Sequence, residues 1–186
     1  MKGKIRKYIS VFMLSAVLLM AGCGDSPVPP SDEEMTRHFL AHEAAFDGIR
    51  EVIARCPYGM YYPPYDMQDT ACLKGVFMED RHTLDSLLEA ISCERVFYFG
   101  KKAKKESGWN GYDTTYTSFT IPYFSHGYSI GGTSKDFVYD PGLKDHPDGH
   151  VTEDGDLNGT YRRTYDDTTL YKRITGDWYI RLEHDN

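Results

Sequence analysis

The sequence predicts an α+β domain, in which a long N-terminal helix and a shorter second helix pack on an antiparallel sheet of about five strands. Two early segments carry apolar residues at steps of three and four, which is typical of helices with one buried face. Later segments form short apolar runs separated by glycine and polar residues, which favours strands. The 15 tyrosines and 9 phenylalanines also favour a sheet, because aromatic side chains pack well on a pleated surface.

Residues 1–22 have the features of a secretory signal peptide. Lysine and arginine come first, an uncharged apolar run extends from Tyr8 to Met20, and small residues precede Cys23. The segment Met20-Ala21-Gly22-Cys23 resembles the lipobox of bacterial lipoproteins. The apolar run is too short to span about 30 Å of hydrocarbon comfortably. We therefore expect residues 1–22 to be removed and Cys23 to carry the lipid.

The charge of the remaining chain argues against anionic partners. Without residues 1–22 the chain has 17 Lys and Arg against 28 Asp and Glu, a net charge of −11. Nucleic acids and anionic lipid surfaces both need a positive field, so we expect no nucleic acid partner and membrane contact through the lipid alone. The length suits one domain with a single core.

The first helix is predicted from its start signal and its apolar spacing. Residues 23–30 are rich in proline and form an extended tether. Ser31 and Glu34 then form a capping box at the start of a single domain, 31–186. Apolar residues recur to about Arg55, so one helix is expected over this stretch, and Pro57 ends it.

Three cysteines remain once Cys23 is lipidated. In an oxidising periplasm they give one disulfide and one free thiol, and their spacing matches no zinc motif. We predict that Cys56 and Cys72 form the disulfide and that Cys93 is a buried thiol at the end of the second helix. The aromatic loop 57–72 fits both a protein-binding face and a loop folded back over the core.

The second helix and the strands follow from changes in periodicity. Leu84, Leu87, Leu88 and Ile91 share one helix face, and that helix ends near Cys93. Strands are expected at 96–99, 116–124 and 134–139. Pro122 indicates an edge or an irregular strand end. Gly131-Gly132 is expected to break the chain before the third of these strands, and residues 140–168 to form a long polar loop.

The C-terminus predicts a hairpin around a three-residue turn at 175–177. This turn pairs Ile174 with Trp178 and Leu170 with Leu182, which gathers the apolar side chains on one face. Lys172, opposite Ile180, is then the single polar residue on that face. A two-residue Gly-Asp turn would place Lys172 opposite Arg181, so the longer turn is preferred.

Several of these segments together resemble a set of small uncharacterised bacterial lipoproteins. They are Ser31-Asp32-Glu33-Glu34-Met35 with His38-Phe39 and His42, then Gly132-Thr133-Ser134-Lys135, and finally the run from Tyr171 to Tyr179. Those lipoproteins share an acidic helix start, a Ser-Lys strand and a C-terminal Trp-Tyr hairpin. The resemblance implies a small α+β lipoprotein and no activity.

One loop has the first half of a calcium-binding pattern. Asp154, Asp156 and Asn158 stand at positions 1, 3 and 5 of an EF-hand loop, with glycine at position 6. Position 12 is Tyr165, which cannot supply the closing carboxylate. The three residues are therefore a weak metal candidate, and we expect no calcium binding of functional affinity.

The remaining motifs give no catalytic residue. His38 and His42 have the spacing of a zinc pair, but Phe39 stands where the protease motif needs its glutamate, so packed histidines are expected. No nucleophile motif is present. The sequence thus predicts a protein that is not an enzyme and needs no cofactor.

Three functional hypotheses result. The first is a membrane-anchored lipoprotein with a non-enzymatic binding or envelope-structure role that faces the periplasm. Gly24 rather than Asp after the cysteine favours the outer membrane. The second is an immunity or exclusion lipoprotein that neutralises a toxin or phage component, which implies a protein partner. The third is a metal-dependent hydrolase that uses the Asp154 loop.

Overall fold

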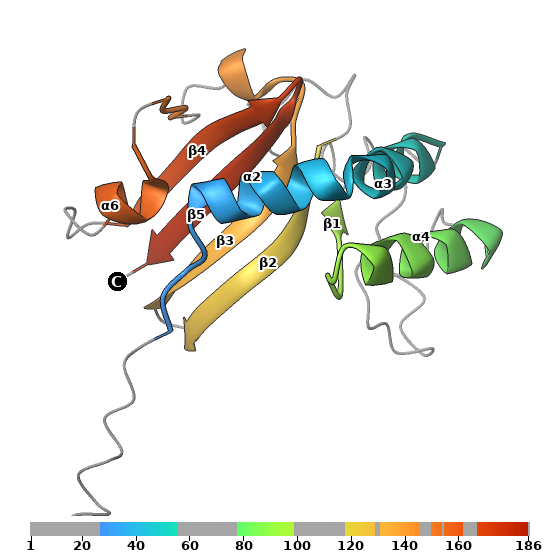
Figure 1. Cartoon of the computed structure of the whole chain (residues 1–186), viewed down its shortest axis with the longest axis horizontal. Coiled ribbons are helices and arrows are strands. Elements are labelled where there is room, and N and C mark those ends of the chain that lie inside the picture. The colour runs from blue at the N-terminus through green and yellow to red at the C-terminus, as the bar shows by residue number, and fades with distance from the viewer. Residues whose placement is uncertain are drawn as a thin grey trace, which may run out of the picture.

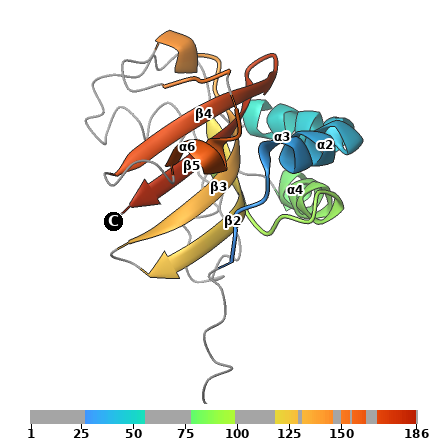
Figure 2. The same cartoon turned by 60° about the vertical axis from the view of Figure 1, so that its left-hand side comes forward.

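Three helices cover one face of an antiparallel sheet (Figures 1 and 2). The computed structural model describes residues 27–55, 78–98, 118–128, 131–145, 150–153, 155–161 and 167–185. The sheet has four long strands, and a two-residue strand extends one edge. The α+β prediction, with N-terminal helices packed on an antiparallel sheet, is confirmed. None of the helices within these ranges is long and apolar enough to cross a membrane.

The strand order places the C-terminal strand inside the sheet. The order is β1-β2-β3-β5-β4, and all neighbours are antiparallel. The strands are β1 (Phe97–Tyr98), β2 (Phe119–Tyr128), β3 (Gly131–Tyr139), β4 (Thr168–Thr175) and β5 (Trp178–Asp185). Because β5 pairs on both sides, its apolar face lies at the centre of the core.

The prediction of one long N-terminal helix is wrong in one respect, because the structure has two helices in this stretch. They are α2 (Asp32–Ala41) and α3 (Glu43–Arg55), and they meet at His42. The His42 ring nitrogen Nδ1 bonds to the carbonyl of His38, and the His42 amide donates to the carbonyl of Phe39. The side chain thus takes the carbonyl that the next helical bond would use, and the helix breaks there.

The third helix, α4 (Met78–Ala90), packs against α3. Helices α3 and α4 are each 13 residues long, so α4 is not shorter than α3. It ends at Ala90, and Ser92 follows with a positive φ of 55°. The predicted helix end near Cys93 is therefore about three residues late.

The core lies between these helices and the sheet. Aromatic rings from both layers form its centre: Phe46 lies 4.6 Å from Phe39, 4.8 Å from Phe137 and 5.4 Å from Trp178 between ring centroids. Ile180 and Leu182 from β5 are also fully buried. The break at His42 lets both α2 and α3 direct a phenylalanine into this one cluster.

The strands of the middle segment differ from the prediction in two places. Strand β3 begins at Gly131, so Gly131-Gly132 lies inside the strand rather than breaking the chain. The predicted loop 140–168 contains a 3-10 turn, η2 (Leu143–Asp145), and a short helix, α6 (Leu157–Tyr161). Pro122 agrees with the edge interpretation, since no described strand pairs the outer side of β2 beyond Thr120, and β2 has a bulge between Pro122 and Phe124. The strand continues to Tyr128, so Pro122 does not mark its end, and the predicted end at 124 is wrong.

The C-terminal hairpin has the predicted register but a different turn. Leu170 faces Leu182 and Lys172 faces Ile180, as predicted. The turn contains only Gly176 and Asp177, and a bulge at Ile174 places Thr175 rather than Ile174 opposite Trp178. The bulge takes up the residue that the shorter turn omits, so the apolar face is preserved.

Candidate functional site

Two consecutive charged residues of β3 are buried, and they point to opposite faces of the sheet. Lys135 is fully buried and Asp136 is 2% exposed. Successive side chains of a strand alternate between faces, so Lys135 shares the helix-covered face with Phe137, and Asp136 lies on the other face. Buried charges are costly unless they are paired and hydrogen-bonded, so both need partners.

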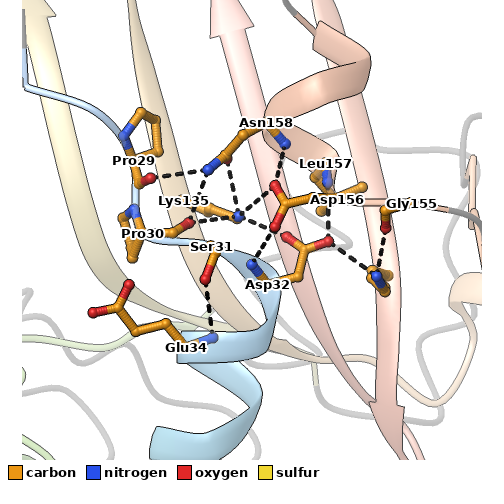
Figure 3. Close-up of polar contacts among 11 residues, drawn as sticks. Pro29, Pro30, Ser31, Asp32, Glu34, Lys135, Gly155, Asp156, Leu157 and Asn158 are labelled. Atoms are coloured by element: carbon orange, nitrogen blue, oxygen red, sulfur yellow. Dashed lines mark hydrogen bonds and ion pairs between the residues drawn. The ribbon is translucent and has the colours of Figure 1, made fainter.

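Lys135 is the centre of a polar cluster at the start of α2 (Figure 3). Its ammonium nitrogen Nζ lies 2.6 Å from Oδ1 of Asp32. It also donates to the carbonyl of Pro30 at 2.7 Å and to Oδ1 of Asn158 at 3.0 Å. The ammonium therefore makes two hydrogen bonds, and its third contact, with Oδ1 of Asp32, is an ion pair without hydrogen-bond geometry. We call Asp32, Lys135, Asp156, Asn158 and Lys172 the Lys135 cluster.

Two aspartates of this cluster cap each other's helices. The amide of Asp32, at the start of α2, donates to Oδ2 of Asp156 at 2.8 Å. The amide of Leu157, at the start of α6, donates to Oδ2 of Asp32 at 2.9 Å. Each carboxylate thus satisfies a free amide at the positive end of the other helix. Lys172 lies 3.2 Å from Asp32, so two lysines face two aspartates.

The same cluster holds the end of the predicted tether. Asn158 donates through Nδ2 to the carbonyls of Pro29 at 2.9 Å and Pro30 at 3.1 Å. Lys135 shares the second of these carbonyls. Proline has no backbone N–H, so carbonyls are the only polar groups that this stretch can offer. The tether is thereby fixed to β3 and α6 (Figure 3).

Two residues of the weak metal candidate, Asp156 and Asn158, belong to this cluster. Oδ1 of Asp156 accepts from the amide of Asn158 at 2.8 Å, and Oδ1 of Asn158 accepts from Lys135. A lysine ammonium therefore lies where these oxygens converge. Asp154 lies outside the described residues. Within the described ranges, no group of three or more His, Cys, Asp or Glu side chains is placed to hold a metal ion.

The histidine pair is packed and hydrogen-bonded, as the sequence predicts. His38 bonds through Nε2 to the carbonyl of Ile91 at 2.9 Å, and its ring lies 4.5 Å from that of His42. Burial, and to a smaller extent His42, lowers the pKa of His38, while the bond to Ile91 opposes this shift. His38 thus joins α2 to the segment after α4.

Only one of the four cysteines, Cys93, lies among the described residues. Cys93 is a free, buried thiol, in agreement with the prediction. Burial and the negative charge of Asp136 raise the pKa of Cys93 to about 12. A thiol that stays protonated at neutral pH is a poor nucleophile. The predicted lipidation site, Cys23, and the predicted disulfide, Cys56 with Cys72, lie outside the described residues.

A family comparison covers the whole of this site. The model of a family described as a domain of unknown function (DUF4948) matches residues 28–186. The chain belongs to this family. No curated protein and no solved structure matches the chain. The family is uncharacterised, as the resemblance implied, and the match begins after Cys23, so it does not bear on lipid attachment.

The sequence prediction missed the central residues of the site in this DUF4948 domain. Lys135 was expected in a strand, Asp32 in a helix start and Lys172 as a single polar residue on an apolar face. Two signals were available. Alternation in β3 places Lys135 with Phe137 on the buried face, and Lys172 lies on the buried face of β4. A lysine on an apolar face requires an acidic partner, and the two lysines share Asp32.

Proposed function

We propose that this DUF4948 domain is the folded part of a membrane-anchored lipoprotein, facing the periplasm at the outer membrane, with a non-enzymatic binding or envelope-structure role. The observation that carries the proposal is the attachment of Pro29 and Pro30 to the Lys135 cluster. A tether that only linked a lipid to a freely moving domain would need no such attachment.

The attachment limits the distance between the domain and the lipid. At roughly 3.5 Å per residue, the chain from Cys23 to Pro29 reaches at most about 20 Å. The tether therefore connects the lipid closely to β3 and α6, because Lys135 and Asn158 bond to its proline carbonyls. A domain held this close presents a defined side to the membrane, which suits a receptor or a structural component of the envelope.

The chemistry of the described residues supports binding rather than catalysis. The Lys135 ammonium is held by two hydrogen bonds and by its ion pair with Asp32, and burial raises the pKa of the Cys93 thiol to about 12. The protonated thiol is a poor nucleophile, and the contacts of the ammonium hold it in the packing of the domain. The contacts of Asp156 and Asn158 with Lys135 and backbone amides also argue against the hydrolase hypothesis. The immunity hypothesis stays a variant of the binding role.

Substitution of the anchoring cysteine tests this proposal. We expect Cys23→Ala to release the protein from the membrane fraction or to leave it unprocessed, because the acyl chains supply about 0.8 kcal/mol per buried methylene. Fractionation combined with labelled palmitate measures both outcomes. Ser26→Ala, in the same tether, is the matched control and should stay lipidated. A mature Cys23→Ala protein in the membrane fraction would contradict the proposal.

A further inference from the structure

We propose that a cleft at the β2 edge of the sheet binds a neutral, polyhydroxylated ligand of the oligosaccharide class. The cleft has a volume of about 570 Å³, within the range of small-molecule sites. The segment 92–97 and the β2 bulge form its walls, and Ser134, Asp136 and Arg181 form its floor. The inference rests on the proposed binding role and gives that role a ligand class.

The charges of the cleft favour a neutral ligand. Its described lining residues include two acids and two bases. Nη2 of Arg181 lies 2.7 Å from Oδ2 of Asp136, and Arg95 lies 3.4 Å from Glu94. Each charge among the described lining residues therefore already faces an opposite charge. An anion or a cation would have to displace one of these partners, whereas a neutral ligand would not.

The floor offers a fixed donor and a fixed acceptor. Oδ2 of Asp136 accepts from Nη2 and Nε of Arg181 and from the hydroxyl of Ser134. Oδ1 of Asp136 and Nη1 of Arg181 make no hydrogen bond and no ion pair with another described residue. Two neighbouring hydroxyls suit this pair, because one can donate to the carboxylate and the other can accept from the guanidinium. The bonds between the two groups hold them in place before a ligand arrives.

The walls suit a sugar ring better than a peptide strand. Phe97, Tyr123 and Phe124 line the cleft, and Phe97 is 37% exposed. Aromatic rings offer rigid apolar surface for the C–H faces of a sugar. A peptide would add through backbone hydrogen bonds to the outer side of β2 beyond Thr120, which no described strand pairs. Pro122 has no N–H and the bulge after it interrupts the ladder, so this edge is a poor template.

A blocking substitution tests the cleft. The purified full chain in detergent is titrated with maltotriose, cellotriose and triacetylchitotriose, with calorimetry and saturation-transfer NMR as readouts. We expect saturable binding of at least one of them. Ser125→Trp places an indole in the cleft from an exposed position of β2, and should weaken binding by about tenfold or more. His126→Trp, the next exposed residue, does not line the cleft and should bind normally.

The inference is overturned if a folded Ser125→Trp protein binds the sugars as tightly as the native protein. It is wrong if the native protein binds none of the three sugars at millimolar concentration, or if both tryptophan variants lose binding equally. It is also wrong if trialanine or a sialylated trisaccharide binds more tightly than every neutral sugar and Ser125→Trp blocks that binding. Should Ser125→Trp fail to fold by circular dichroism, Phe97→Ala removes one wall and should weaken binding several-fold. Membrane fractionation of Cys23→Ala is read independently, so either proposal can fail alone.

Discussion

Lys135 and Asp136 are neighbours in β3, and both are buried, yet their surroundings differ. Lys135 faces the helix layer, where the tether, α2 and α6 close over it and supply its two hydrogen-bond acceptors and its ion-pair partner. Asp136 faces the other side, where Arg181 pairs with it at the floor of an open cleft. The comparison shows that covering segments close over one buried charge and leave its neighbour lining a cleft. In our proposals the first charge serves assembly and the second serves recognition.

The largest effect is expected from Lys135→Met. The substitution leaves the carbonyl of Pro30 and Oδ1 of Asn158 without this donor and leaves Asp32 with Lys172 as its remaining lysine. Removal of one partner from a buried ion pair costs about 3–5 kcal/mol. Urea denaturation of the detergent-solubilised protein measures the free energy of unfolding. Lys144→Met, at an exposed position of η2, is the control, and a loss as small as that of the control would contradict the buried cluster.

A smaller loss is expected from Asp136→Asn, on the cleft side. Arg181 keeps Glu183 at 3.3 Å, and its side chain is 25% exposed, so water compensates part of the lost pair. Burial also raises the pKa of Asp136 against the effect of Arg181, which shows that the charged form is held at a cost. We expect a loss of about 1–3 kcal/mol in the same denaturation experiment. A loss larger than that of Lys135→Met would reverse the comparison.

Next in size is Asp156→Ala, which removes one half of the reciprocal caps. The amides of Asp32 and Asn158 lose their acceptor. Loss of a capping side chain costs about 1 kcal/mol. Hydrogen exchange should accelerate at these two amides, while the amides of β3 and β5 keep their protection. Glu33→Ala, an exposed residue in the same helical turn, is the matched control. Uniform acceleration across the sheet would contradict a local role.

The parts of the fold that the sequence predicts are those with local periodicity. The hairpin register follows from the apolar side chains of β4 and β5, because a shift by one residue would turn all of them to the other face. The break at His42 was not predictable from spacing, since it depends on a bond between the imidazole and the carbonyl of His38. Apolar spacing continues across the break, so periodicity alone favoured one helix.

The candidate site was harder to predict because its members are far apart in the chain. Asp32 and Asp156 are 124 residues apart, and each one alone is an ordinary helix-start residue. Only the fold brings α2 and α6 together over β3. The cleft has the same difficulty: its floor depends on the pairing of Asp136 with Arg181 across β3 and β5, and no local pattern encodes that pairing.

The smallest effect is a pH dependence at His38, which connects the helix layer to the wall of the cleft. Its ring lies 5.1 Å from that of Tyr123, a lining residue, and its Nε2 bonds to the carbonyl of Ile91. Burial lowers the pKa of His38 below its ordinary value of 6.5, so the unfolded chain binds more protons than the folded one in this range. The stabilisation from the neutral ring is therefore fully present above pH 6.5 and is lost as the pH falls below that value.

Denaturation at several values between about pH 7.5 and 5.5 should show that the free energy of unfolding declines as the pH falls. The decline should be shallower in His38→Gln, because glutamine can still donate to Ile91 but does not titrate. His126→Gln, on the exposed end of β2, should keep the native slope. Equal slopes in the native protein and His38→Gln would show that this ring does not make the stability depend on pH.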